Sequence, residues 1–188
     1  MSARGEIQVV MGPMFSGKST ELIRRLDRYE RAGRRVVGVK SAIDKRYSEA
    51  PLIVTHRQHT FGAVVASALL PLELDAYDVI GVDEGQFYAD LAAACERWAA
   101  AGKTVVVALL DGDARREPFP GSQLAELLAR AESVTKLLAV CQRCGADAAF
   151  TQLHSAATQL DANHVKVGGA DLYRAACRHC HAEPQAPN

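Results

Sequence analysis

Short apolar runs alternate with amphipathic stretches from residue 7 to residue 140. Five of the runs are aliphatic and hardly alternate with polar residues, which is typical of strands covered on both faces. We expect strands at residues 7–11, 36–40, 79–83, 105–110 and 134–140. A helical period of apolar residues predicts helices at residues 19–32, 88–101 and 122–131. This order predicts an α/β fold with a parallel sheet flanked by helices.

The composition changes after Val140. Apolar runs give way to a Cys-x-x-Cys pair, a stretch rich in Thr, Gln, Ser and Asn, and a second Cys-x-x-Cys pair. We therefore predict an α/β domain over residues 1–140 and a small cysteine-bearing domain over residues 141–182. Residues 183–188 are expected to form a disordered tail.

A phosphate-binding loop follows the first predicted strand and opens the first predicted helix. It reads Gly12-Pro13-Met14-Phe15-Ser16-Gly17-Lys18-Ser19-Thr20, a complete G-x-x-x-x-G-K-S pattern. Backbone N–H groups at the helix N-terminus would hold the α- and β-phosphates of ATP. Lys18 would reach the β- and γ-phosphates, and Ser19 would bind Mg²⁺. The motif predicts a P-loop NTPase-like, RecA-like sheet.

Two carboxylates, Asp83 and Glu84, end the third predicted strand. Open α/β sheets hold their ligands at the carboxyl ends of strands, so we expect this pair to face the phosphate loop. Asp83 is placed to hold Mg²⁺, and Glu84 to deprotonate a nucleophile attacking the γ-phosphate. The pair does not distinguish a hydrolase, which activates water, from a kinase, which activates a substrate hydroxyl.

Four of the five cysteines form two pairs, Cys141 with Cys144 and Cys177 with Cys180. Their spacing is right for tetrahedral Zn²⁺, and a closed four-cysteine site has a structural role. The pairs are 32 residues apart, so the site would clip the base of a long loop. A redox role, or His179 and His181 as ligands, are alternatives. Cys95 is expected to be a buried apolar residue.

The overall charge is balanced, with 22 basic and 22 acidic residues, which disfavours a nucleic-acid partner. The chain has no apolar run of about 18 residues and no apolar signal segment. We expect a cytoplasmic protein without membrane contact. Six arginines at residues 24–35 are interpreted as the solvated face of the first helix. Arg46, after the second strand, is a candidate to stabilise transferring charge.

Several motifs in order resemble those of the cytosolic-type thymidine kinases, over about residues 5–180. Beside the phosphate loop and the cysteine pairs, the resemblance rests on Asp83-Glu84-Gly85-Gln86-Phe87, Pro118-Phe119, Ala131-Glu132-Ser133-Val134 and Gly168-Gly169-Ala170-Asp171. It implies transfer of the ATP γ-phosphate to the 5′-hydroxyl of thymidine, with Glu84 as general base and Lys18 and Arg46 assisting. It also implies a homotetramer, feedback inhibition by dTTP and acceptance of deoxyuridine.

The resemblance further implies a "lasso" loop, residues 151–173, closed over the base and held at its foot by zinc. The implied nucleoside contacts are Met14, Phe87, Leu110, Phe119, Thr151, Val167, Gly168, Gly169 and Tyr173. Two departures stand out. This chain has Ala114 near where the family usually places a stacking aromatic, which predicts weaker thymidine binding, and residues 49–71 match poorly. A nucleic-acid-associated P-loop ATPase with a zinc ribbon, and a nucleotide-binding module without turnover, are the alternative functions.

Overall fold

A mostly parallel sheet forms the centre of the protein. The computed structural model describes residues 4–43, 52–54, 60–154 and 168–182. The strand order of the large sheet is β3-β4-β2-β5-β6-β1-β7, and every neighbouring pair is parallel except β3 with β4. The strands are β1 (Glu6–Gly12), β2 (Val36–Ser41), β3 (Leu52–Val54), β4 (Thr60–Ala66), β5 (Val79–Val82), β6 (Thr104–Leu110) and β7 (Ser133–Lys136).

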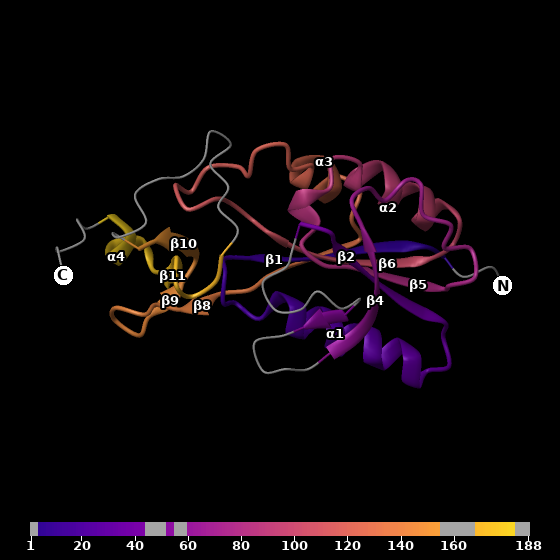
Figure 1. Cartoon of the computed structure of the whole chain (residues 1–188), viewed down its shortest axis with the longest axis horizontal. Coiled ribbons are helices and arrows are strands. Elements are labelled where there is room, and N and C mark those ends of the chain that lie inside the picture. Colours follow the sequence, from indigo (N-terminus) through magenta and orange to yellow (C-terminus); the bar gives the residue numbers. More distant parts are fainter. Residues whose placement is uncertain (1–3, 44–51, 55–59, 155–167, 183–188) are drawn as a thin grey trace.

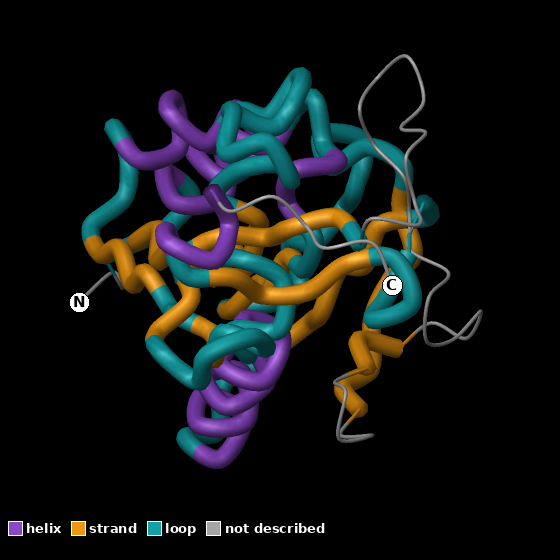
Figure 2. The backbone as a smooth tube through the Cα atoms, turned by 90° about the vertical axis from the view of Figure 1, so that its left-hand side faces the viewer, coloured by secondary structure: helices purple, strands orange, loops and turns teal. Residues whose placement is uncertain are grey.

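Helices cover both faces of this sheet (Figures 1 and 2). One face carries α1 (Lys18–Arg31), and the other carries α2 (Leu91–Ala100) and α3 (Leu124–Leu128). Successive residues of β6 point to opposite faces, so Val107 joins the core that contains Trp98, while Val106 joins the core that contains Leu26. Burial on both faces explains why β6 is apolar without alternation and why all its residues are buried.

The cysteine-bearing part of the chain lies at one end of the molecule, beyond the carboxyl end of β1 (Figure 1). It contains two antiparallel strand pairs and one short helix. They are β8 (Ala139–Val140) with β9 (Asp147–Ala148), β10 (Phe150–Leu153) with β11 (Tyr173–Ala176), and α4 (Arg178–Ala182). The fold class is the predicted one, an α/β domain with a small C-terminal cysteine unit. No helix in the described ranges is both long and apolar enough to cross a bilayer.

Some predicted elements were wrong in extent. The single strand expected at residues 134–140 is two strands, because the chain leaves the large sheet after Lys136 and β8 pairs with β9 instead. The helix expected at residues 122–131 is only the short α3. A 3-10 turn, η1 (Gly85–Phe87), precedes α2, which begins at Leu91 and not at residue 88. Strands β3 and β4 were not predicted. The domain division stays a prediction, and residues 183–188 lie outside the described ranges.

The strand order places three strand ends side by side. β5, β6 and β1 are consecutive neighbours and parallel, so their carboxyl ends share one edge of the sheet. The phosphate loop follows β1, Asp83 and Glu84 follow β5, and Leu110 ends β6. Ligands of open α/β sheets bind at such an edge. The topology therefore brings together segments that are distant in the sequence.

Candidate active site

The phosphate loop joins β1 to the first turn of α1, as the motif predicts. The Nζ of Lys18, a buried side chain, donates to the carbonyl oxygen of Pro13 at 2.7 Å. The hydroxyl of Ser16 donates to the same carbonyl oxygen at 2.8 Å. The ammonium is thereby held inside the curve of the loop, beside the helix N-terminus. A cation and a helix N-terminus directed at one place form an anion site suited to phosphates.

Gly12 occupies a position that no side chain fits. A Cβ placed there would lie 2.4 Å from the carbonyl oxygen of Leu137, which is backbone and has little freedom to retreat. The N–H of Leu137 in turn donates to the carbonyl of Met11 at 2.8 Å. The loop therefore begins in close contact with the segment that follows β7. The first glycine of the motif is required for this approach.

The carboxyl end of β5 reaches the start of α1 through one side-chain hydrogen bond. Ser19 Oγ donates to Oδ1 of Asp83 at 3.1 Å, and Asp83 is only 7% exposed. The N–H of Asp83 donates to Val39 O at 2.9 Å, which fixes the backbone of this strand end. A hydroxyl and a carboxylate are the oxygen ligands that Mg²⁺ takes in P-loop proteins. The donor set thus fits the predicted magnesium site.

Backbone strain gathers around the same edge. Among the described residues, the non-glycine residues with φ in the left-handed region are Phe15 at 66°, Glu84 at 52° and Arg116 at 70°. Phe15 belongs to the phosphate loop, and Glu84 directly follows Asp83. Such conformations cost about 1–3 kcal/mol each and persist where the surroundings impose them, often at functional sites. The strain supports a functional role for this strand end.

Glu84 is the second carboxylate at the end of β5 and is 9% exposed. The side-chain amide of Gln86 donates through Nε2 to Oε2 of Glu84. The Oε1 of the same amide accepts from the backbone N–H of Leu110 at 3.0 Å. Beside them Tyr88 is buried, and burial together with the charge of Asp83 raises the pKa of its phenol above its usual range.

An apolar cluster adjoins the phosphate loop and the carboxyl end of β6. Its buried members are Met14, Leu110 and Tyr173, and the half-buried side chains packed against them are Phe15, Ala114, Phe119, Leu153 and Leu172. The rings of Phe87 and Phe119 meet edge to face with centroids 5.7 Å apart. The N–H of Met14 donates to Oγ1 of Thr151 at 3.0 Å. Residues from four separate segments thus form one apolar wall, and the predicted roles of its members in nucleoside binding stay predictions.

The other predicted acceptor residues lie in the approach to β11 or outside the described ranges. Gly169 starts a turn in which its carbonyl oxygen accepts from Tyr173 N at 3.0 Å, and its N–H donates to Asp171 Oδ1 at 3.0 Å. Gly168 immediately precedes this turn. Val167 and Arg46, together with most of the expected lasso loop, lie outside the described residues, so their predicted roles stay predictions.

The four paired cysteines converge as the spacing predicts. The Sγ atoms of Cys141, Cys144, Cys177 and Cys180 all lie within 4.8 Å of one another, and those of Cys144 and Cys177 are 3.7 Å apart. Tetrahedral Zn²⁺ with sulfur ligands at about 2.3 Å requires sulfurs roughly 3.8 Å apart, so the residues fit this ion. Burial raises the pKa of Cys141, but backbone N–H groups, chiefly that of Cys177, outweigh it and bring it to about 6.

The comparison with known proteins agrees with this geometry. A family model described as thymidine kinase matches residues 5–181. The chain belongs to the thymidine kinase family. It is 44% identical over 180 residues to the cytosolic thymidine kinase of Homo sapiens, which covers 95% of this chain and 74% of that protein. It is 41% identical over 181 residues to the thymidine kinase of Variola virus, covering 95% and 98%. The Raccoon poxvirus thymidine kinase is 42% identical over 180 residues, covering 94% and 97%.

The histidines beside the cysteines have other positions in this chain. Within the described ranges, the group of side chains that fits a metal contains the four cysteines and neither His179 nor His181. The Nε2 of His181 lies 3.1 Å from the carbonyl oxygen of Ala114, and its ring meets Phe150 edge to face at 5.8 Å. His181 therefore links the cysteine unit to the wall of the apolar cluster. Cys95 is fully buried, as expected, and burial raises its pKa to about 12.

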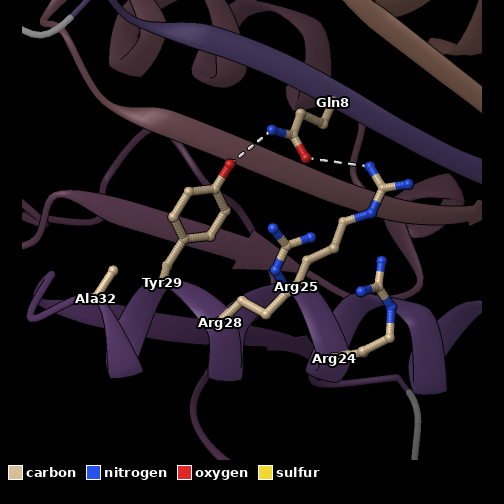
Figure 3. A pocket seen from close by; sticks show the side chains of 6 residues that line it. All are labelled: Gln8, Arg24, Arg25, Arg28, Tyr29 and Ala32. Atoms are coloured by element: carbon tan, nitrogen blue, oxygen red, sulfur yellow. Dashed lines mark hydrogen bonds between the residues drawn. The ribbon is translucent and has the colours of Figure 1, made fainter.

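The arginine-rich face of α1 borders a surface pocket of about 390 Å³ (Figure 3), lined by Gln8, Arg24, Arg25, Arg28, Tyr29 and Ala32. Several polar side chains that line this pocket form hydrogen bonds with one another or with Glu21. Arg25 bonds Glu21 at 2.8 Å and Gln8 at 3.1 Å, and Gln8 donates to the hydroxyl of Tyr29 at 2.8 Å. Hydrogen bonds from the arginines, chiefly Arg24, lower the pKa of Glu21 to about 2. Arg24, Arg28 and Arg31 are exposed on α1, as predicted. Arg25 instead is half-buried and bonds Gln8, and Arg34 and Arg35 follow the end of the helix.

Sequence reasoning gave no role of their own to Gln86 and His181. Gln86 was noted only as part of a motif, and His181 only as an alternative metal ligand. A signal for Gln86 existed, because a polar residue two positions after a candidate base, within an apolar turn, must find buried partners. No sequence signal placed His181 against Ala114, because that contact depends on how α4 packs.

Proposed function

We propose that this protein transfers the γ-phosphoryl group of ATP to the 5′-hydroxyl of thymidine, and of deoxyuridine, in nucleotide salvage. The product from thymidine is dTMP. The observation that carries the proposal is the meeting of three features at one edge of the sheet in a chain of the thymidine kinase family. These are the phosphate loop after β1, the carboxylates after β5 and the apolar wall that contains Met14 and Leu110.

The donor half is the phosphate loop. Backbone N–H groups at the start of α1 hold the phosphates, and Lys18 exchanges its bond to Pro13 for oxygens of the β- and γ-phosphates. Ser19 and Asp83 would hold Mg²⁺, which would offset the charge of the phosphates during transfer. Arg46 is assigned to the charge of the transferring group on sequence grounds alone.

The acceptor half is the apolar cluster with Glu84 at its margin. Glu84 takes the proton of the 5′-hydroxyl as the phosphoryl group moves in line, which requires its oxygen within hydrogen-bond reach of that hydroxyl. Met14, Leu110, Thr151 and Tyr173 surround the methyl group of thymine. The nucleoside is flanked by Phe87 and Phe119, and backbone groups of Gly168 and Gly169 hydrogen-bond the base. Val167 is assigned to the same contact on the sequence resemblance alone.

The cysteine cluster is assigned to structural Zn²⁺. Four protein ligands close a tetrahedral site and leave no position for substrate, so the ion would stabilise the fold and take no part in phosphoryl transfer. The position of the cluster explains how a bound ion would stabilise the fold. Cys144 precedes β10 and Cys177 follows β11, so a bound ion joins both ends of the hairpin that carries Thr151 and Tyr173.

The test is ATP consumption by the purified chain with thymidine, single-stranded DNA or RNA as the candidate acceptor. We expect turnover that depends on thymidine and does not rise with either nucleic acid. Glu84→Gln should lower kcat at least about 100-fold and leave ATP affinity unchanged, since general bases typically contribute 10²–10⁴-fold. Turnover stimulated by DNA would instead support a nucleic-acid-associated ATPase.

Assembly, regulation and location complete the proposal. We expect a homotetramer in the cytoplasm that dTTP inhibits by placing its base in the thymidine pocket and its phosphates over the donor site. Sedimentation of the purified chain measures the assembly. Inhibition by dTTP should be competitive with thymidine, and inhibition that thymidine does not relieve would contradict this binding mode.

A further inference from the structure

Gln86 is a buried polar side chain that joins two strand ends. It lies in η1, immediately after the carboxyl end of β5, and is 3% exposed. Its Nε2 donates to the carboxylate of Glu84, and its Oε1 accepts from Leu110 N at the end of β6. One amide group therefore connects the acid after one strand to the backbone of the neighbouring strand.

The chemistry of its partners fixes the orientation of this amide. An ionised carboxylate only accepts hydrogen bonds, and a backbone N–H only donates them. The amide nitrogen must therefore face Glu84 and the oxygen must face Leu110. A side chain held at both ends in this way has one rotamer, and it imposes a definite position on the carboxylate that it contacts.

The partners of Gln86 belong to the two halves of the acceptor site. Leu110 is one of the buried members of the apolar cluster, and Glu84 is the proposed base. Phe87, the next residue after Gln86, contacts Phe119 of the same cluster. The short turn η1 thus carries both the group that holds Glu84 and an aromatic ring beside the acceptor.

We infer that Gln86 is a positioning residue, which holds the Glu84 carboxylate at a fixed place relative to the wall that orients the acceptor. This inference rests on the proposed function, in which Glu84 deprotonates the acceptor hydroxyl. The backbone of Glu84 is left-handed, with a φ of 52°, which is a strained conformation for a non-glycine residue. The Gln86 bridge supplies a side-chain restraint on this carboxylate. A displacement of about 1 Å of a catalytic group lowers rates by as much as 100-fold.

The first experiment compares steady-state kinetics of Gln86→Leu with those of the wild type. Leucine nearly matches the volume of glutamine and removes both hydrogen bonds. We expect kcat to fall roughly 10- to 100-fold, with KM for thymidine and for ATP within about threefold of the wild type. Gln8→Leu is the matched control. Gln8 is a half-buried glutamine on β1 that bonds Tyr29 and Arg25 away from Glu84, so kcat should stay within about twofold.

The second experiment uses Gln86→Glu and the pH profile of kcat. The introduced carboxyl can still accept from Leu110 N, but it donates to Glu84 only when it carries a proton. Two carboxyl groups at hydrogen-bond distance cannot both ionise without repulsion. The ratio of variant to wild-type kcat should therefore fall as pH rises. If residue 86 does not contact Glu84 in the working enzyme, the ratio should not change with pH.

The results for three variants decide between the inference about Gln86 and the proposed function. If folded Gln86→Leu has the kcat of the wild type, Gln86 is not a positioning residue. A kcat ratio for Gln86→Glu that does not change with pH leads to the same conclusion. The Gln86→Glu experiment can be read even if Gln86→Leu does not fold. The Glu84→Gln variant shows whether a failure concerns the role of Gln86 or the proposed function. If Glu84→Gln is inactive while Gln86→Leu is fully active, only the inference about Gln86 fails. If Glu84→Gln retains turnover, the base assignment itself fails.

Discussion

Ser19 donates a hydrogen bond of 3.1 Å to Asp83, and this bond joins the first turn of α1 to the carboxyl end of β5. The two residues are 64 positions apart in the sequence. They meet because β5 and β1 both border β6 in one parallel sheet. Two oxygen ligands at such a meeting point are placed to hold Mg²⁺ beside the phosphates of ATP.

Ser19→Ala should therefore raise the Mg²⁺ concentration that gives half-maximal activity roughly tenfold, the effect of losing about 1.4 kcal/mol. The measurement is kcat against free Mg²⁺ at saturating ATP and thymidine. Ser122→Ala is the control, because the Oγ of Ser122 accepts from Leu124 N at the start of α3, and its Mg²⁺ requirement should match that of the wild type. An unchanged Mg²⁺ requirement in Ser19→Ala would rule out this ligand.

Removal of zinc should weaken thymidine binding far more than ATP binding. Cys144→Ser breaks the four-sulfur cluster, which frames the hairpin carrying Thr151 and Tyr173. We expect loss of the bound metal and a rise in KM for thymidine of about tenfold or more, with KM for ATP within about twofold. Metal content is measured by elemental analysis, beside steady-state kinetics.

The matched control for that experiment is Cys95→Ala. Cys95 is fully buried in the core between the sheet and α2, away from the cluster. This variant should retain one zinc ion per chain and the wild-type KM for thymidine. Equal thymidine KM values in Cys144→Ser and the wild type would show that the cluster does not support the acceptor site.

The core between α1 and the sheet gives a test of packing. A Cβ on Gly81 of β5 would lie 2.5 Å from Cδ1 of Leu26, so Gly81→Ala overpacks this contact. We expect the free energy of unfolding to fall by about 1–3 kcal/mol. Leu26→Ala should lower it by about 2–5 kcal/mol, because Leu26 is fully buried.

The double variant Gly81→Ala with Leu26→Ala shows whether both losses of stability arise from the contact between these two residues. With Leu26 shortened, the added methyl group has space, so the combined loss in urea unfolding should be at least about 1 kcal/mol smaller than the sum of the single losses. Strictly additive losses would mean that the Gly81 backbone, and not the contact with Leu26, sets the cost.

Local patterns predicted much of the site, because its chemistry lies at strand ends. Asp83 and Glu84 could be identified from the apolar run before them, and Lys18 from the glycines of its loop. The bridge from Glu84 through Gln86 to Leu110 could not, because it depends on β5 and β6 being neighbours. Strand order is a property of the whole chain that no local window contains.

The errors in the secondary structure also have physical causes. The run at residues 134–140 is apolar enough to suggest one buried strand, yet Val134, Leu138 and Val140 are all substantially exposed. β7 is an edge strand and β8 belongs to another sheet, so the apolar residues at 134–140 do not mark one buried strand. β4 was missed because it alternates between half-buried and exposed residues and lacks a continuous aliphatic run.

Ala114 offers a direct test of how the acceptor wall is built. The residue is half-buried against the cluster of Met14, Leu110 and Tyr173, and its carbonyl oxygen is held by His181. Ala114→Phe would add a ring on the side of this cluster while keeping the backbone contact. We expect thymidine affinity to rise about fivefold, the value of about 1 kcal/mol for an aromatic contact. Calorimetric titration with thymidine measures this, and ATP affinity should stay unchanged. An unchanged or lower thymidine affinity would show that the space beside Ala114 does not face the nucleoside.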